Sequence, residues 1–328
     1  MTEWTEFSGT DGAWDSVVES SHGSGFMQSS QWARFKQAEG YRCSRLVWKP
    51  KDGPSGQALL LAYPGDGFTV CPEGPCLAWE DEPCCRPALQ ALIRHVRATN
   101  ALGLRIEPRI AEPAPRLLKN WSRAAVDLDP VHTLIADLRK SEQERLASLH
   151  PKTRYNLRLA WRHGVEVAES LDPADARGFH DLFLETAGRN GFFAEPFSFF
   201  LNLAQCLFPS GRARFLFAKK DGLPCSAMVL LICGKRATYL YGASSDERRR
   251  FMSTYALHWE AMRVAFREGC TEYDFYGYDP FGHPDHLYAG ISRFKRGWGA
   301  EHRTWIGARD YLFYDRVAGR VVEKLLDF

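Results

Sequence analysis

The chain has 328 residues, and a soft expectation of roughly 150 residues per domain divides that length into about two domains. Hydrophobic residues make up 45% of the chain, aromatic residues 13% and charged residues 25%, which excludes a disordered, collagen-like or coiled-coil protein. The formal net charge is +2, so the overall charge gives no argument for a nucleic-acid or membrane partner. Any basic surface must be formed by local clustering.

No segment is apolar enough to cross a membrane. The longest uninterrupted apolar run, Ala227 to Cys233, has seven residues, far fewer than the roughly 18 that a membrane helix needs. The N-terminus carries Glu3 and no basic segment followed by an apolar one, so no export signal is predicted. We expect a cytoplasmic protein without a transmembrane segment.

The nine cysteines favour reduced thiols over disulfides, because their number is odd and no C-x-x-C motif occurs. Cys71, Cys76, Cys84 and Cys85 lie close together, but their spacing matches no common zinc-ligand pattern. No metal site is predicted.

The first half of the chain alternates helical and strand-like segments and shows no internal repeat. The predicted elements are a serine-capped helix over 29–36, strands over 58–62 and 68–70, a helix over 88–98, a strand over 102–107, a proline-rich linker over 108–115, a strand over 124–128 and a helix over 133–148.

A second round of alternation follows. The predicted elements are a helix over 152–163 ended by Gly164, a strand over 165–168, helices over 174–188 and 197–207, strands over 214–218, 226–233 and 237–241, a helix over 254–269 capped by Ser253 or Thr254, a strand over 273–276 and a long helix over 311–326. Residues 220–222 form a hairpin turn. The pattern predicts two mixed-sheet α/β domains with a boundary near residue 150.

The helix over 152–163 carries a basic stripe. Lys152, Arg154, Arg158 and Arg162 occur without any acid between them, and the three arginines follow at i, i+4 and i+8 on one side of the helix. Such a stripe suits a polyanion. A merely solvated helix face is an equally weighted alternative.

A second basic cluster lies near the C-terminus. Arg293, Phe294, Lys295 and Arg296 precede the sequence Gly-Trp-Gly of 297–299, which predicts a turn that brings its backbone close to a ligand. A cation there suits a phosphate or a developing oxyanion. A plain surface loop is the alternative.

Other candidate groups are weaker. Asp274 lies in an aromatic strand, where an unpaired carboxylate is costly, so it needs a structural or substrate partner. His283 and His286, near Asp279 and Asp285, have the residue types of a metal site, but the neighbouring prolines favour a surface loop. No G-x-S-x-G, P-loop, H-E-x-x-H or G-x-G-x-x-G motif occurs, so hydrolase, kinase and dinucleotide-binding functions are unsupported.

Six segments, in order along the chain, resemble the signature stretches of the FemABX family of aminoacyl-tRNA-dependent peptidyltransferases. They are GFMQSSQW at 25–32 with Phe35-Lys36, LRIEP at 104–108, KTRYNLR at 152–158 with Gly164-Val165, YGASS at 241–245, YDFYG at 273–277 and RFKRGWG at 293–299. The resemblance covers nearly the whole chain.

The resemblance implies an α/β fold of two tandem GNAT-like acyltransferase domains, residues 1–148 and 149–309, with a C-terminal helix over 310–328 that packs on the first. Because the helix from Lys152 leads directly to Val165, the chain has no room there for the helical-hairpin arm of some members. It resembles the compact branch of the family.

The resemblance also implies a reaction. An amino acid of the glycine, alanine or serine type moves from aminoacyl-tRNA to the side-chain amine of the third residue of a peptidoglycan stem peptide. The acceptor is a UDP-linked or lipid-linked muropeptide, the latter reached by peripheral contact with the inner membrane leaflet. No cofactor is expected, because the turn over 246–252, where a coenzyme-A-dependent relative needs glycines to receive pyrophosphate, contains none.

Site residues follow from the same resemblance. Lys295, in the Phe294-Lys295 pair, is expected to stabilise the oxyanion or the terminal phosphate of the donor. Glu107 is expected to orient or deprotonate the attacking amine, with a structural role as the alternative. The expected substrate-binding residues are Lys36, Arg189, Phe193, Tyr241 and Asp274, and Phe193 replaces a tyrosine of some members. The expected tRNA-binding residues are Lys152, Arg154, Arg158, Arg162, Arg293 and Arg296.

Three other functions remain open at this point. One is a ligase that loads an amino acid from tRNA onto a small natural product, and another is a non-catalytic tRNA-binding relative. The third is a coenzyme-A-dependent acyltransferase.

Overall fold

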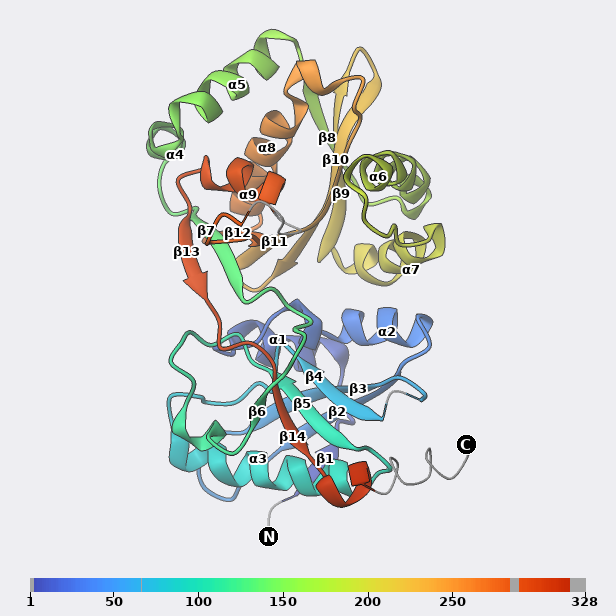
Figure 1. The fold of residues 1–328 in the computed structure, drawn as a ribbon, viewed down its shortest axis with the longest axis vertical. Coiled ribbons are helices and arrows are strands. Elements are labelled where there is room, and N and C mark those ends of the chain that lie inside the picture. Colours follow the sequence, from blue (N-terminus) through green and yellow to red (C-terminus); the bar gives the residue numbers. More distant parts are fainter. Residues whose placement is uncertain (1–2, 66, 284–288, 319–328) are drawn as a thin grey trace. The chain divides into compact units, whose positions relative to one another are not determined.

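The computed structural model describes residues 3–65, 67–283 and 289–318. The chain divides into two compact units (Figure 1): unit 1 consists of Met1–Val131 and Thr304–Phe328, and unit 2 of His132–Arg303. Each unit is built on its own seven-stranded mixed sheet.

Unit 1 has the strand order β1-β2-β3-β4-β5-β14-β6. Its core lies between the sheet and α3, where Leu89, Leu92 and Val96 follow a helical period. The elements are β1 Trp4–Glu6, α1 Asp11–Ser20, η1 Phe26–Gln28, α2 Ser30–Ala38, β2 Arg42–Trp48, β3 Gly56–Ala62, β4 Phe68–Pro72, α3 Glu82–Arg97, β5 Gly103–Glu107, η2 Arg116–Leu118, β6 Ser122–Arg123 and β14 Arg309–Leu312.

Unit 2 has the strand order β13-β7-β12-β11-β10-β9-β8. Helices α6 and α7 cover one face of the sheet, and α4, α5, α8 and α9 lie on the other side (Figure 1). The elements are β7 His132–Asp137, α4 Glu142–Ser148, α5 Pro151–Arg162, β8 Glu166–Ser170, η3 Pro173–Asp175, α6 Ala176–Asn190, α7 Phe197–Leu207, η4 Phe208–Ser210, β9 Ala213–Lys220, β10 Leu223–Cys233, β11 Arg236–Ser244, η5 Arg249–Phe251, α8 Ser253–Arg267, β12 Glu272–Gly277, α9 Ala289–Arg296 and β13 Glu301–Thr304.

The two sheets repeat one topology. In unit 1, β1 to β4 pair antiparallel in sequence order, and β4 then pairs in parallel with β5 after the crossover helix α3. In unit 2, β8 to β11 do the same, and β11 pairs in parallel with β12 after the crossover helix α8. This repetition is what two tandem domains of one fold type predict.

The boundary between the units follows from the strand that pairs with the outer side of β12 in unit 2 and of β5 in unit 1. In unit 2 it is filled by β7, antiparallel to β12, and in unit 1 by β14, antiparallel to β5. The boundary therefore lies at residue 131, earlier than the predicted residue 148, because β7 is a strand of the second sheet and α4 lies in the second unit.

Two elements predicted near the boundary, one on each side of it, are wrong. The predicted helix over 133–148 is strand β7 followed by helix α4, because Leu134 and Ala136 alternate into the core beside β12, and Ser141 starts the helix with a capping box. The predicted strand over 124–128 is irregular beyond Arg123. Its apolar residues Val126 and Leu128 are exposed and bury no face of a sheet.

The chain returns to unit 1 through a strand. The predicted helix over 311–326 begins too early, because Tyr311 pairs with Leu104 in the ladder of β14 and β5. Residues 314–318 are helical, and the rest of the prediction lies outside the described residues.

Most of the other predicted elements are confirmed, with differences at their ends. The Ser29 side chain accepts a hydrogen bond from the Trp32 amide and caps α2, as the sequence indicates. Helix α8 has no side-chain cap, and its N-cap is Met252 in the left-handed conformation instead of Ser253 or Thr254. The sequence patterns did not predict strands β1 and β2 or helix α1.

Candidate active site

The parallel strands of unit 2 diverge toward their carboxyl ends. Strands β11 and β12 pair only as far as Thr238 and Asp274. Just beyond, a register shift between β10 and β11 leaves Leu240 without a paired residue, so β11 carries a bulge. The carboxyl ends of parallel strands are the usual place for ligands in open α/β sheets. This divergence marks the candidate site.

Lys295 reaches both diverging strands. Its side chain is 4% exposed, its Nζ donates a hydrogen bond of 2.6 Å to the carbonyl oxygen of Gly277 at the end of β12, and it lies 5.3 Å from the ring centroid of Tyr239 in β11. Burial lowers the pKa of this ammonium to about 7, against an opposing effect of the Asp274 charge. A buried cation is therefore held between the strand ends.

The segment of Lys295 is a helix and not the turn that the sequence predicts. Residues 289–296 form α9, because the turn begins only at Gly297, whose amide bonds to the Phe294 carbonyl. A Cβ at Gly297 would lie 2.2 Å from Thr153 Oγ1, and the Gly297 carbonyl accepts the amide of His150. The glycine thus lets α9 pack directly on the start of α5.

Asp274 has partners within the sheet, on its own strand β12 and on the neighbouring strand β7. Its Oδ1 accepts the Tyr276 amide at 2.8 Å and the hydroxyl of Thr133 on the neighbouring strand β7. Tyr276 has a φ of +62°, a strained value for a residue with a side chain. The Asp274 carboxylate therefore stabilises the turn of backbone that presents the Gly277 carbonyl to Lys295.

Two groups that the sequence did not single out, His258 and Tyr239, complete the surroundings of Lys295. His258 of α8 lies 2.8 Å from the Tyr273 hydroxyl, and burial, with the nearby Lys295 charge, lowers the pKa of its imidazole well below the usual range. Tyr239 is partly buried against the core, and this desolvation raises the pKa of its phenol. In the sequence, His258 could be recognised only as a residue on the inward face of the predicted helix over 254–269. Phe294 packs with Tyr255 and His258 and contributes no polar atom.

Two of the expected substrate residues of unit 2, Arg189 and Tyr241, lie at the end of β11. Arg189 donates from Nη1 to the Ser244 carbonyl at 2.9 Å and from Nη2 to the Ser244 hydroxyl at 3.1 Å. Tyr241 packs among phenylalanines of α6 and α7, including Phe183 and Phe200. Phe193, beyond the end of α6, is 87% exposed.

Lys36 lies in unit 1, near the end of α2. Its Nζ is 4.0 Å from the ring centroid of Tyr41 and 5.5 Å from that of Phe35, so aromatic faces orient the ammonium. Lys36 and Arg189 belong to different units, so the surroundings of each are described only within its own unit.

Glu107, also in unit 1, is arranged for the structural alternative. Its carboxylate is buried and accepts the backbone amides of Leu128 and Asp129, with Oε1 at 3.0 Å and 3.1 Å. Burial raises the pKa of Glu107 to about 8, and the Asp129 and Asp127 charges act in the same direction. The carboxylate fixes the loop that leads out of unit 1.

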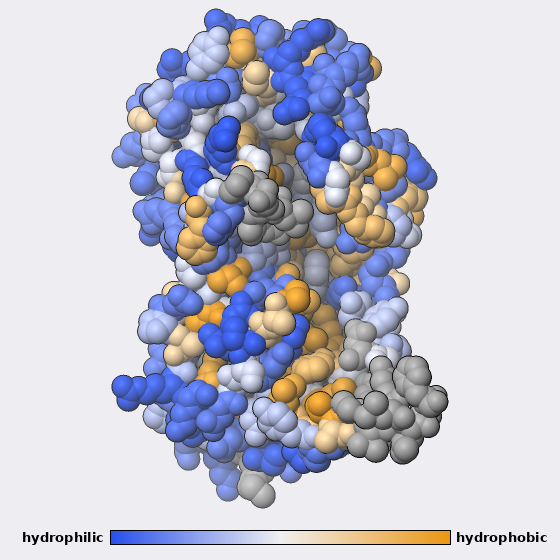
Figure 2. All heavy atoms as spheres, viewed as in Figure 1, coloured by the Kyte–Doolittle hydropathy of each residue, from blue (hydrophilic) through white to orange (hydrophobic). Residues whose placement is uncertain are grey.

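The basic stripe is on the exposed side of α5. Arg158 and Arg162 are exposed and Arg154 is half-buried, and an open pocket runs along them, lined also by Tyr155 and Trp161. Hydrophilic residues predominate around α4 and α5, with a few hydrophobic ones among them (Figure 2). Lys152 and Arg293 are exposed as well, and Arg296 donates to the Asp279 carbonyl at 2.6 Å.

No grouping of three potential metal ligands among His, Cys, Asp and Glu is present in residues 3–65, 67–283 and 289–318. His286 and Asp285 lie outside the described residues, and the His283 amide donates to Asp279 Oδ2. At the turn before α8, the Arg249 side chain pairs with Asp246, which offsets its charge.

Two family models match the chain. Residues 10–120 match the FemAB family, and residues 151–296 match the acetyltransferase (GNAT) domain. Each match falls within one of the two structural units. The fold prediction of two tandem GNAT-like domains is confirmed.

Relatives and solved structures extend the likeness over the whole chain. The lipid II:glycine glycyltransferase of Staphylococcus saprophyticus is 23% identical over 381 aligned positions, covering 92% of both chains. A crystal structure of FemX superposes with a TM-score of 0.86 at 22% identity over 97% of this chain and 99% of its own. A tandem GNAT protein from the clavulanic acid biosynthesis pathway has a TM-score of 0.57 at 13% identity, over 95% and 98%.

The fold and these similarities define a transferase enzyme built from two acyltransferase-type domains. Over nearly its whole length the chain is similar to the FemABX family. Its alignment with the staphylococcal relative spans more positions than this chain has residues, so that relative carries segments without a counterpart here. Between α5 and β8 only residues 163–165 intervene, which leaves no arm.

None of the described helices is long and apolar enough to cross a membrane.

Proposed function

We propose that this enzyme transfers an amino acid from aminoacyl-tRNA to the side-chain amine of the third residue of a peptidoglycan precursor, at the divergent ends of β11 and β12. The observation that carries the proposal is Lys295, a buried cation held against the Gly277 carbonyl between the two strands. The names of the staphylococcal relatives support lipid II as the acceptor and glycine as the amino acid, which remain proposals for this chain.

Transfer of an activated amino acid from its ester to an amine needs few catalytic groups. A neutral amine attacks the ester carbonyl, a tetrahedral oxyanion forms, and the ribose hydroxyl leaves with a proton. A positioned ammonium in a water-poor site is a strong stabiliser of such an oxyanion, since it requires little reorganisation during the reaction. Lys295 fits that role because its hydrogen bond to the Gly277 carbonyl and its contact with the Tyr239 ring already fix its position.

Two cations are proposed to hold the acceptor. Arg189, fixed by two hydrogen bonds to Ser244, retains the planar donor group that suits phosphate oxygens. Lys36 offers its ammonium near the end of α2, beside Tyr41. Each cation by itself suits a phosphate oxygen of a lipid-linked or nucleotide-linked precursor. Phe193, Tyr241 and Asp274 contribute no such cation.

Mass spectrometry of a reaction with total charged tRNA tests the proposal. Parallel reactions receive lipid II or its UDP-linked pentapeptide precursor, and fragmentation locates any added residue. Addition to the third residue of either acceptor supports the proposal, and the added mass identifies the amino acid. An enzyme that loads no residue onto either acceptor, with active tRNA present, is not this transferase.

A single substitution tests the assigned role of Lys295. We expect Lys295→Ala to lower single-turnover transfer by roughly 100- to 1,000-fold, the usual effect of losing one oxyanion donor. Lys235→Ala is the matched control, because Lys235 is a lysine whose ammonium also donates to a backbone carbonyl, that of Gly269, but lies at the surface. Normal transfer by Lys295→Ala contradicts the role.

A further inference from the structure

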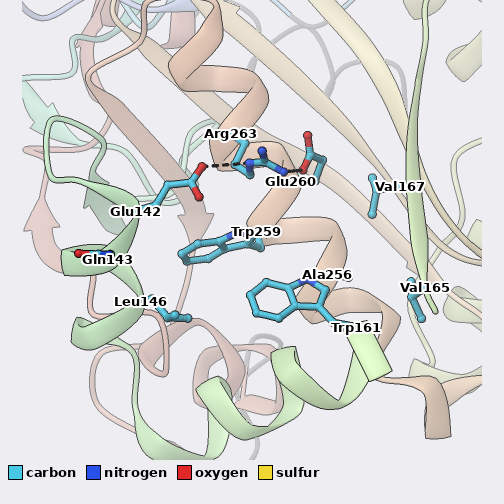
Figure 3. A pocket seen from close by; sticks show the side chains of 10 residues that line it. All are labelled: Glu142, Gln143, Leu146, Trp161, Val165, Val167, Ala256, Trp259, Glu260 and Arg263. Atoms are coloured by element: carbon cyan, nitrogen blue, oxygen red, sulfur yellow. Dashed lines mark hydrogen bonds and ion pairs between the residues drawn. The ribbon is translucent and has the colours of Figure 1, made fainter. Parts of the chain in front are cut away.

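We propose that unit 2 holds an unpaired nucleobase of the donor RNA in a pocket formed by α4, α5, α8 and β8. This inference rests on the aminoacyl-tRNA donor of the proposed function. The pocket has a volume of about 390 Å³ and is lined by Glu142, Gln143, Leu146, Trp161, Val165, Val167, Ala256, Trp259, Glu260 and Arg263 (Figure 3).

Two indole rings make the pocket a stacking site. Trp161 of α5 and Trp259 of α8 lie with ring centroids 6.2 Å apart and ring planes at 77° (Figure 3). Trp161 is 44% exposed, so part of its ring is accessible to a ligand. Unpaired bases stack on such side chains, and the contact tolerates different bases because every base has a π-face.

The polar rim suits a base as well. Arg263 pairs with Glu142 and with Glu260, each at 3.0 Å (Figure 3). The arginine charge partly neutralises the two carboxylates, whose oxygens can still accept hydrogen bonds. Guanidinium donors and carboxylate acceptors together match the edge of a nucleobase, which carries both kinds of group. A purely aliphatic ligand would leave these groups unused.

Charge complementarity identifies the occupant as RNA. Trp161 lines both this pocket and the open pocket along α5, where its neighbours are Tyr155 and three arginines, Arg154, Arg158 and Arg162. Tyr155 is 58% exposed, and Arg162 lies 5.8 Å from its ring centroid. Single-stranded nucleic acid binds surfaces of this kind, where cations contact its phosphate backbone and exposed aromatic rings stack on its bases.

The spacing along α5 connects this surface to the candidate active site. The start of α5 packs on Gly297, two residues from Lys295, through His150 and Thr153. From Thr153 to Trp161 the helix rises about 12 Å. Three stacked nucleotides span about 10 Å at 3.4 Å each. The unpaired CCA end of a tRNA is therefore comparable in length with this part of α5, so a base held at Trp161 directs the rest of the strand along α5 toward the segment of Lys295.

Binding of deacylated RNA tests the inference without any transfer reaction. Anisotropy titrations compare an acceptor-stem hairpin that ends in unpaired CCA with the same hairpin ending blunt. We expect the wild-type enzyme to bind the CCA-ended hairpin more tightly, and Trp161→Leu to lower that affinity roughly 5- to 100-fold while leaving the blunt hairpin unaffected. Trp161→Phe should recover most of the loss, since it keeps a stacking ring.

The controls separate this inference from the proposed function. Thermal unfolding of each variant confirms folding, and if Trp161→Leu does not fold, the wild-type comparison of the two hairpins decides. Equal binding of both hairpins overturns the base pocket even if transfer occurs. Weak, equal binding by Trp161→Leu and Trp161→Phe overturns stacking. Tight binding of the CCA end by an enzyme that transfers nothing refutes the proposed reaction and leaves the pocket standing.

Discussion

The ammonium of Lys295 donates a 2.6 Å hydrogen bond to the carbonyl oxygen of Gly277, joining helix α9 to the end of strand β12. The carbonyl is presented by a backbone turn that Asp274 stabilises through the Tyr276 amide. Burial lowers the pKa of Lys295 to about 7, so its charge changes within the range in which an enzyme is assayed.

The pH dependence of transfer should report this charge. If the ammonium stabilises the oxyanion, kcat/KM of the wild-type enzyme falls as the pH rises through about 7, because the cationic fraction of Lys295 declines. The residual activity of Lys295→Met should lack that descending limb. Initial rates between pH 5.5 and 9, roughly the range in which the chain is expected to fold, measure both profiles. Superimposable profiles contradict the prediction.

The same lysine should leave a signature in folding stability. Its pKa is 10.5 unfolded and about 7 folded, so between these values the unfolded state binds more protons and wild-type stability rises with pH. The destabilisation caused by burying the charged ammonium is complete below about pH 7 and absent above about pH 10.5. Relative to wild type, Lys295→Met should gain up to roughly 4 kcal/mol near neutral pH, less the lost hydrogen bond, and progressively less toward pH 10.

Urea unfolding of the two proteins at several pH values measures this difference. Other titrating groups are common to both chains and cancel in the comparison. A stability difference that stays constant from neutral to alkaline pH rules out a cationic, buried Lys295.

Glu107 should behave as a structural acid. Its folded pKa of about 8 exceeds the unfolded 4.5, so the folded state binds more protons and wild-type stability falls as the pH rises from 4.5 to 8. Glu107→Gln keeps an acceptor for the Leu128 and Asp129 amides and removes this slope. We expect its kcat to stay within about twofold of wild type at matched folded concentration. A large loss of kcat with intact stability would restore a direct role in the reaction.

Sequence patterns were sufficient where the decisive contacts are local. The basic stripe of α5 could be predicted because it depends on the 3.6-residue period of the helix and on the stop at Gly164, which are both local properties of the sequence. Strand β7 was mistaken for part of a helix, since Leu134 and Leu138 fit a helical spacing as well as an alternating one. Pairing with β12, about 140 residues later in the chain, decided for the strand.

The candidate site shows the same limit. The resemblance pointed to Lys295, but neither His258 nor Tyr239 could be linked to it from the sequence, because the bulge in β11 and the packing of α8 bring them together. Glu107 likewise has a suitable residue type for catalysis, and only its hydrogen bonds to Leu128 and Asp129 reveal the structural arrangement.

Arg189 should affect acceptor binding more than turnover. Arg189→Ala removes a planar donor group fixed at Ser244, and without its charge-assisted hydrogen bonds to phosphate the acceptor KM should rise roughly 10- to 100-fold with little change in kcat. Lys36→Ala should act similarly. Arg139→Ala, an exposed arginine paired with Asp137, is the control. An unchanged KM for both lipid-linked and UDP-linked acceptors refutes the phosphate interaction.

The arginines of α5 should contribute to RNA binding through counterion release. If Arg158 and Arg162 each neutralise one phosphate, replacing either with alanine should reduce the slope of log K against log salt by roughly 0.7 to 0.9, for blunt and CCA-ended hairpins alike. Arg86→Ala is the matched control, because Arg86 is also exposed on a helix but pairs with Glu82. Titrations across a range of potassium chloride concentrations give the slopes. Slopes equal to that of wild type would mean that the stripe is only a solvated helix face, and the RNA must then bind elsewhere.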